Sequence, residues 1–312
     1  MLSNLWLGVA VVYASEAGRE GAERAVEALK KIGVAAAAFK YSELDEIWGC
    51  YDAYLFVMAA GGVVRALCPR LRAKGQDPAV VVTSHDLRYF VPLLGMHWGA
   101  NELAEALAKA LGGVAVITTA AEALGFAPVE AVERALLCSL APEDRLEVYK
   151  RLTSGGEVCV EARLPAELPG YRSGGDCPVT IRVGCNGRLC CKPWRLYVGF
   201  GATSAASADE VVEAVRAVLS QIGAARVEAV ASVKDLVYQV ASAIGATAVR
   251  LDPSQLRGAK CLSPPVEAAV KALGVGNVAE AAALTAAGPG SWLVYRKRAF
   301  GGRVTVAVAA NA

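Results

Sequence analysis

The chain has 312 residues, of which 55% are hydrophobic and 20% charged, and its formal net charge is +2 at pH 7. This length suffices for two or three domains, and the hydrophobic content supports sizeable cores rather than disorder. The near-neutral charge, without a lysine and arginine block, gives no electrostatic basis for binding nucleic acid or a membrane surface. No run reaches the ~18 apolar residues that a membrane span requires, and the N-terminus lacks a signal-peptide pattern, so we expect a cytoplasmic protein.

Residues 1–124 alternate between apolar runs and amphipathic stretches. Strands are predicted at 5–13, 34–39, 53–58, 79–83, 90–94 and 114–118, and helices at 20–32, 61–72 and 101–111, with a short helix after Ser42. Nearly uninterrupted apolar runs are typical of strands covered on both faces. The β-α alternation predicts an N-terminal α/β domain with a mostly parallel sheet and helices on both sides.

The pattern changes twice further along the chain. Residues 125–193 predict a small α+β middle region, with helices at 128–140 and 144–152 and strands at 157–163 and 179–183. Residues 194–312 predict a second α/β domain, with strands at 196–200, 226–231, 247–251, 293–295 and 303–309 and helices at 207–219, 234–244, 265–273 and 277–284. The predicted class is therefore α/β, with an α+β region between two α/β domains.

Four of the nine cysteines lie close together in the middle region, at Cys177, Cys185, Cys190 and Cys191. The paired C-x-x-C spacing of structural zinc sites is missing, and no histidine lies nearby, so zinc is disfavoured. The remaining alternatives are buried small side chains and local disulfides.

Residues 59–119 contain two arrangements of strand, glycine and helix. In the first, Gly61 and Gly62 precede Arg65. Helix N-terminal amides there would bind a carboxylate, and the guanidinium of Arg65 would hold it with two hydrogen bonds. The alternative is a turn in which glycine is required for positive φ.

The second arrangement holds His97 and Asn101, four residues apart around Gly99. The positive end of a helix favours the neutral imidazole, which suits a general base. The alternative is local hydrogen bonding, with Asn101 as a helix N-cap. His85 is the only other imidazole in the chain. Serine nucleophile elbows, a Walker loop and a G-x-G-x-x-G fingerprint are absent, so neither ATP nor a nicotinamide cofactor is suggested.

Three blocks then occur in order along the chain. They are AGGVVR at 60–65 with Lys74 and DPAVVV at 77–82; LLGMHWGANELA at 93–104 with VITT at 116–119; and GVGNVAEAAAL at 274–284 with Lys297 and TVAVA at 305–309. Together they resemble the CbiG family, the cobalt-precorrin-5A hydrolases of anaerobic cobalamin biosynthesis. The family's G-H-x-G-G-A-N appears here as Met96-His97-Trp98-Gly99-Ala100-Asn101, with one of the family's glycines lost on each side of His97.

The resemblance implies a cobalt corrinoid substrate with a δ-lactone on ring A. Water opens the lactone, and C20 leaves as acetaldehyde to give cobalt-precorrin-5B. His97 is the implied catalytic residue, and the implied substrate contacts are Gly61, Gly62, Arg65, Lys74, Gly99, Asn101, Thr118, Thr119, Glu280 and Lys297. Cobalt arrives with the substrate, so neither a protein metal site nor a cofactor is expected, and other cobalamin-pathway enzymes are the expected protein partners. The alternatives are a non-catalytic corrinoid carrier or scaffold and a generic anion-binding module.

Overall fold

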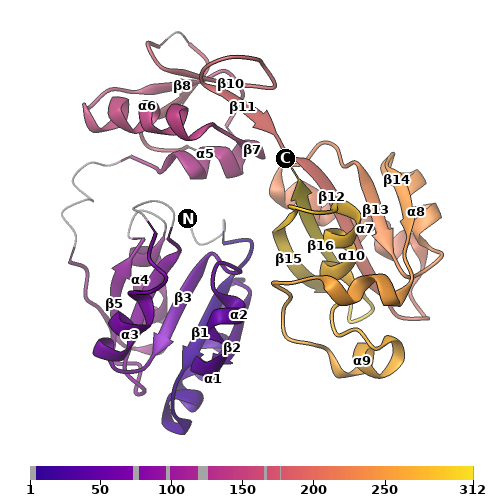
Figure 1. Ribbon diagram of the computed structural model, residues 1–312, viewed down its shortest axis with the longest axis horizontal. Helices are drawn as coiled ribbons and strands as arrows, with labels where there is room; N and C mark the ends of the chain where they lie inside the picture. The colour runs from indigo at the N-terminus through magenta and orange to yellow at the C-terminus, as the bar shows by residue number, and fades with distance from the viewer. Residues whose placement is uncertain are drawn as a thin grey trace. The chain divides into compact units, whose positions relative to one another are not determined.

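The computed structural model describes residues 5–72, 77–95, 99–118, 126–164, 167–175 and 177–311. The chain divides into two compact units, Met1–Ala120 and Ala121–Ala312. The first unit contains a six-stranded sheet, and the second contains two five-stranded sheets (Figure 1). The predicted α/β class is confirmed. Within the described residues, no helix combines the length and apolarity needed to cross a bilayer.

The N-terminal sheet has the strand order β2-β1-β3-β4-β5-β6. Strands β2, β1, β3 and β4 are parallel, β5 is antiparallel to β4, and β6 is parallel to β5. The prediction of a mostly parallel sheet is therefore correct, with a reversal at β5. The elements are β1 (Val9–Tyr13), α1 (Glu16–Lys31), β2 (Ala36–Lys40), η2 (Tyr41–Glu43), α2 (Leu44–Ile47), β3 (Ala53–Val57), α3 (Ala60–Leu67), β4 (Ala79–Thr83), β5 (Tyr89–Leu94), α4 (Ala100–Leu111) and β6 (Val114–Ala115).

Alternate residues of the buried strands form two cores, one on each face of this sheet. Val11 and Leu55 pack with α1 and α4 on one face, and Val12 and Phe56 pack with α2 and α3 on the other. Side chains on a strand point alternately to opposite faces, so the uninterrupted apolar runs fill both cores. The sheet is consequently covered by helices on both faces, as the β-α alternation predicted (Figure 1).

Two predicted boundaries at the start of the chain are wrong. β1 begins at Val9 rather than Leu5, because Gly8 adopts φ +77° and a Cβ there would lie 2.1 Å from Ala35 O. Helix α1 begins at Glu16 rather than residue 20. Ser15 caps it, since Ser15 Oγ accepts a hydrogen bond of 3.1 Å from Gly18 N.

The first sheet of the second unit has the order β7-β11-β10-β8-β9. The predicted helix at 128–140 ends at Leu136, because Leu137 has a left-handed φ of 52° and strand β7 follows. Disulfides join Cys138 to Cys191, Cys159 to Cys177 and Cys185 to Cys190, so the cysteines that crowd together in the sequence are bridged. The elements are α5 (Val129–Leu136), β7 (Cys138–Ser139), α6 (Pro142–Thr153), β8 (Val158–Val160), β9 (Tyr171–Ser173), β10 (Thr180–Val183) and β11 (Cys190–Pro193).

The second sheet of this unit has the order β14-β13-β12-β16-β15, with β16 antiparallel to both of its neighbours. The elements are β12 (Arg195–Ala202), α7 (Ala208–Ile222), β13 (Ala229–Ser232), α8 (Val237–Ile244), β14 (Thr247–Arg250), η5 (Pro253–Gly258), α9 (Glu267–Leu273), α10 (Val278–Ala287), β15 (Trp292–Phe300) and β16 (Val304–Asn311). Gly199 lies inside β12 against α10, where a Cβ would be 2.0 Å from Ala279 O and 2.4 Å from Ala283 N. Both Gly199 and Gly201 therefore lie within the strand, which extends to Ala202.

Replacing Gly199 with alanine should lower the free energy of unfolding by about 3 kcal/mol, because the new methyl group would overlap the backbone of α10. Gly258→Ala is the matched control, since a Cβ at Gly258 has no neighbour within 4 Å. Urea unfolding followed by circular dichroism measures both changes. Equal stabilities of the two variants would contradict the close contact between β12 and α10.

Candidate functional site

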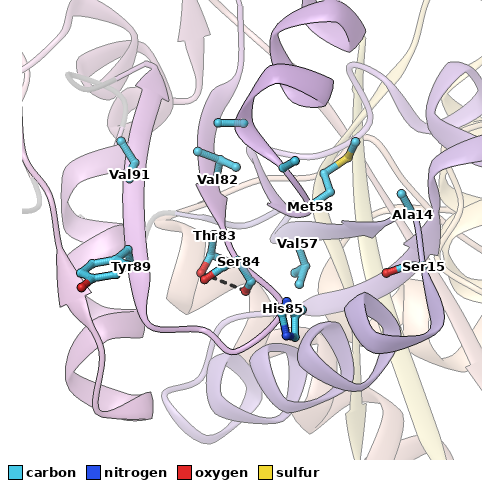
Figure 2. Close-up of a pocket in the computed structure, with 12 residues that line it drawn as sticks. Ala14, Ser15, Val57, Met58, Val82, Thr83, Ser84, His85, Tyr89 and Val91 are labelled. Atoms are coloured by element: carbon cyan, nitrogen blue, oxygen red, sulfur yellow. Dashed lines mark hydrogen bonds between the residues drawn. The ribbon is translucent and has the colours of Figure 1, made fainter.

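A pocket of about 600 Å³ lies at the carboxyl edge of the parallel strands in the N-terminal unit. It is formed where β1, β3 and β4 end, and Tyr89 and Val91 of the returning strand β5 close one side. Figure 2 shows apolar and polar side chains around the same space; the lining residues are Ala14, Ser15, Val57, Met58, Ala59, Ala60, Val82, Thr83, Ser84, His85, Tyr89 and Val91. Apolar walls with a few polar groups are typical of small-molecule sites.

The strand order explains why the pocket forms here. After β1 the chain enters α1 on one face of the sheet, and after the adjacent β3 it enters α3 on the other face. Such a switch in direction leaves a crevice outside the carboxyl ends of the two strands. The N-termini of α1 and α3, at Ser15 and Ala60, both line it. Helix N-termini carry partial positive charge, so the pocket favours an anionic group.

The polar side of the pocket is the turn after β4. Leu87 N donates to Ser84 O at 3.0 Å, and Leu87 closes the turn with φ 60°. Ser84 Oγ donates a hydrogen bond to Asp86 Oδ1, which also accepts from Arg88 N at 3.3 Å. These bonds lower the pKa of Asp86, the Ser84 contact most strongly, and proximity to His85 acts in the same direction. The turn therefore places an ionised carboxylate beside the His85 imidazole.

Two glycines of α1 fix the helix against this edge of the sheet. A Cβ at Gly18 would lie 2.9 Å from Val57 O, and a Cβ at Gly21 would lie 2.7 Å from His85 O. Only a residue without a side chain permits both approaches. The backbone of His85, in the turn after β4, is therefore packed closely against α1.

Gly61, Gly62 and Arg65 lie beside the pocket, on the first two turns of α3. Arg65 Nη1 donates to Gly61 O at 3.1 Å, which places the guanidinium against Gly61, the residue after Ala60 of the lining. Both glycines have helical φ, so a turn requiring positive φ is wrong. A Cβ at Gly62 would lie 2.8 Å from Met58 Cε, so this glycine leaves room for the Met58 wall of the pocket.

Gly99 and Asn101 lie at the opposite edge of the sheet. Strand β5 runs antiparallel to β4 and reaches its amino end, where a Cβ at Gly95 would lie 2.7 Å from Ala79 Cα. Ala79 and the pocket residue Thr83 are the two ends of β4, about 13 Å apart along a strand. The structure therefore separates Gly99 and Asn101 from Gly61 and Gly62.

The sequence-based predictions for Gly99, Asn101 and Thr118 are only partly met. Gly99 is the N-cap of α4 with φ 100°, so Asn101 is not the N-cap; it lies buried in the first turn of the helix. Thr118 is exposed, beyond the short strand β6. Lys74, His97 and Thr119 lie outside the described residues, so the assignment of His97 stays a prediction.

Glu280 and Lys297 belong to a buried network in the second unit. Glu280 is fully buried in α10 and accepts hydrogen bonds from Ser263 N and Ser263 Oγ, both at 2.6 Å, and from Lys297 N at 3.1 Å. Arg296 Nη1 lies 3.7 Å from Glu280 Oε1. Lys297 Nζ donates to Asn277 Oδ1, and burial lowers the pKa of Lys297.

These contacts give Glu280 a structural role, because a buried carboxylate requires donors and a cation. The network ties the loop at Ser263 to α10 and β15. Substrate binding by Glu280 and Lys297 stays a prediction.

Sequence reasoning did not single out the turn containing Ser84, His85 and Asp86 as a site. The available signal was a polar triplet directly after the buried strand β4, at the edge where α/β sheets bind ligands. Among the described residues, no group of three histidine, cysteine, aspartate or glutamate side chains is arranged to hold a metal ion.

Comparisons with known proteins give the class of the chain. The family model described as Cobalamin synthesis G N-terminal matches residues 42–122, and the model described as Cobalamin synthesis G C-terminus matches residues 196–309. A crystal structure of a cobalamin biosynthesis protein G homolog from Sulfolobus solfataricus matches with a TM-score of 0.85 at 27% identity, covering 100% of this chain and 99% of that one.

Two relatives carry a more specific name. A protein from Priestia megaterium named cobalt-precorrin-5A hydrolase is 28% identical over 305 residues, which is 85% of this chain and 80% of that protein. A protein of the same name from Salmonella typhimurium is 44% identical over 73 residues, or 23% of this chain and 21% of that protein. The chain belongs to the CbiG family of cobalamin synthesis proteins.

Replacing Glu280 with alanine should lower the free energy of unfolding by about 3–5 kcal/mol, because Arg296 would lose its buried carboxylate. Glu213→Ala is the control, since Glu213 is an exposed glutamate on helix α7 of the same unit. Thermal and urea unfolding measure the difference. A Glu280→Ala variant as stable as the control would show that Glu280 does not hold this part of the fold.

Proposed function

We propose that the chain is a cobalt-precorrin-5A hydrolase of cobalamin biosynthesis. The observation that carries the proposal is the match of both CbiG family models in their expected order, supported by an alignment over 85% of the chain with a relative of that name. The fold similarity to the Sulfolobus solfataricus homolog, over nearly the whole of both chains, agrees with it.

The reaction proposed from the resemblance has two parts. Water first adds to the carbonyl carbon of the ring A lactone, and the acyl C–O bond breaks to give a carboxylate and a hydroxyl group. The hydroxyl then loses its proton, its carbon becomes a carbonyl, and the carbon–carbon bond to the macrocycle breaks to release acetaldehyde, with the electron pair of that bond left on the macrocycle. This chemistry needs a proton acceptor, donors for the developing oxyanion and contacts for peripheral carboxylates. Cobalt enters as part of the substrate.

The carboxyl-edge pocket offers these features together. Apolar walls at Val57, Val82 and Val91 suit the methyl-bearing rim of a macrocycle. The first turns of α1 and α3 attract a carboxylate or an oxyanion. The Arg65 guanidinium, held at Gly61 O, adds a full positive charge beside α3. We therefore place the reacting edge of the corrinoid in this pocket.

The purified chain, mixed anaerobically with cobalt-precorrin-5A, should release one acetaldehyde for each corrinoid converted. Acetaldehyde is trapped as a hydrazone, and the corrinoid product is identified by its mass. Arg65→Gln should raise KM by about tenfold or more, because one charged contact to a carboxylate contributes about 1.5–3 kcal/mol. The exposed Arg24 of α1, changed to glutamine, is the control.

Corrinoid binding without acetaldehyde would contradict the proposal and indicate a carrier or scaffold. No corrinoid binding at all would indicate a module with another ligand. A KM that stays unchanged in Arg65→Gln, with turnover intact, would place the substrate away from α3.

A further inference from the structure

We propose that His85, rather than His97, is the acid–base residue of the lactone-opening step. This inference rests on the proposed function and assigns a residue to its chemistry. His85 lines the pocket and belongs to the turn after β4. Of the twelve lining residues, it is the one whose side-chain chemistry allows it both to accept and to donate a proton near neutral pH.

The position of His85 is fixed from two sides. Its carbonyl oxygen lies against Gly21 of α1, and its turn is closed by the bond from Leu87 N to Ser84 O. Catalytic groups have to be held close to their productive geometry, and a site on rigid elements achieves this better than a free loop. The imidazole therefore emerges from an anchored backbone.

The electrostatic environment of His85 suits proton transfer. Hydrogen bonds from Ser84 Oγ and Arg88 N lower the pKa of Asp86, so an ionised carboxylate lies in the same turn as His85. At the start of α3, which also lines the pocket, the amides of Ala60 and Gly61 have no backbone acceptor among the described residues. These amides can receive the negative charge that develops on the lactone carbonyl oxygen.

Hydrolysis of the lactone requires one group that accepts and then returns a proton, and His85 can serve as that group. Its imidazole takes a proton from water as the water oxygen bonds to the lactone carbonyl carbon. The tetrahedral intermediate then loses its ring C–O bond, and the electron pair of that bond stays on the departing oxygen. The imidazolium returns its proton to this oxygen, which becomes the hydroxyl group, and the imidazole is regenerated.

The pocket and the segment around Gly99 lie at opposite ends of β4. His85 directly follows Ser84 at the carboxyl end of β4, whereas Gly95 and Gly99 lie at its amino end. A single reacting bond cannot contact both ends of a five-residue strand. A reacting bond held in the pocket beside His85 is therefore out of reach of Gly99 and Asn101.

His85→Ala should reduce acetaldehyde release by about 10²-fold or more. Corrinoid binding should stay within about threefold of the unchanged chain. Added imidazole should restore part of the turnover of His85→Ala, since a small base can occupy the space left by the side chain. A purely structural role of His85 would not give this rescue. His97→Ala is assayed in parallel, with and without imidazole.

Full turnover of His85→Ala would overturn the assignment. So would imidazole rescue of His97→Ala without rescue of His85→Ala. If His85→Ala unfolds, His85→Gln is assayed in its place. Wild-type turnover in His85→Gln would also overturn the assignment. These outcomes are separate from the proposed function, because the unchanged chain releases acetaldehyde in each of them.

A second readout does not require turnover. The chain has two histidines, so its imidazole proton signals are few, and His85→Gln identifies which belong to His85. Titration with cobyrinic acid, a stable cobalt corrinoid bearing carboxylates, should shift the His85 signals as binding saturates. Saturable binding that leaves the His85 signals in place would overturn the assignment even if the chain is active. Failure of the unchanged chain to bind cobyrinic acid would likewise overturn the assignment of His85.

Discussion

The direction of the chain around β1 determines the geometry of the N-terminal unit. β1 lies between β2 and β3, so the helices that follow β1 and β3 must cover opposite faces of the sheet. This arrangement opens a crevice at the carboxyl edge and points two helix N-termini into it. Glycines at positions 18 and 21 let α1 approach that edge closely. The pocket is thus a consequence of strand order and of two missing side chains.

The second unit shows how the same class of fold stabilises polar groups that it buries. Helix α10 lies so close to β12 that only glycine fits at position 199. Its Glu280 is fully buried and is satisfied by Ser263, Arg296 and the backbone of Lys297. Close helix packing brings the carboxylate inward, and the surrounding donors offset the cost of removing it from water. The alanine-rich helix and the charged residues near it therefore form one structural arrangement.

Much of the fold could be predicted from the sequence, because its signals are local. Apolar runs located every strand of the first unit, and the β-α alternation predicted the helices on both faces of its sheet. The reversal at β5 could not be predicted, since the turn from Ser84 to Leu87 uses a leucine in a left-handed conformation where glycine would have been the recognisable signal. Short strands such as β9 and β11 have too few residues to show a periodicity.

The reversal at β5 also explains what sequence reasoning missed at the site. Parallel strands would have brought both glycine segments to one edge, where they would form a single pocket. The antiparallel strand instead leaves Gly61, Gly62 and Arg65 beside the pocket and carries Gly99 and Asn101 to the other edge. The turn after β4, which sequence reasoning did not single out as a site, then supplies Ser84 and His85 to the polar wall of the pocket. Pairing direction depends on contacts distant in sequence, which local patterns do not contain.

The most direct test of this account is the position of cobalt in crystals of the chain grown with a bound cobalt corrinoid. Anomalous diffraction at the cobalt absorption edge locates the metal independently of any assumption about the ligand. One cobalt peak is expected at the carboxyl edge of the N-terminal sheet, next to Ser15, Ala60 and His85. A peak beside Gly99 and Asn101 at the opposite edge, or one bound to the second unit alone, would contradict it.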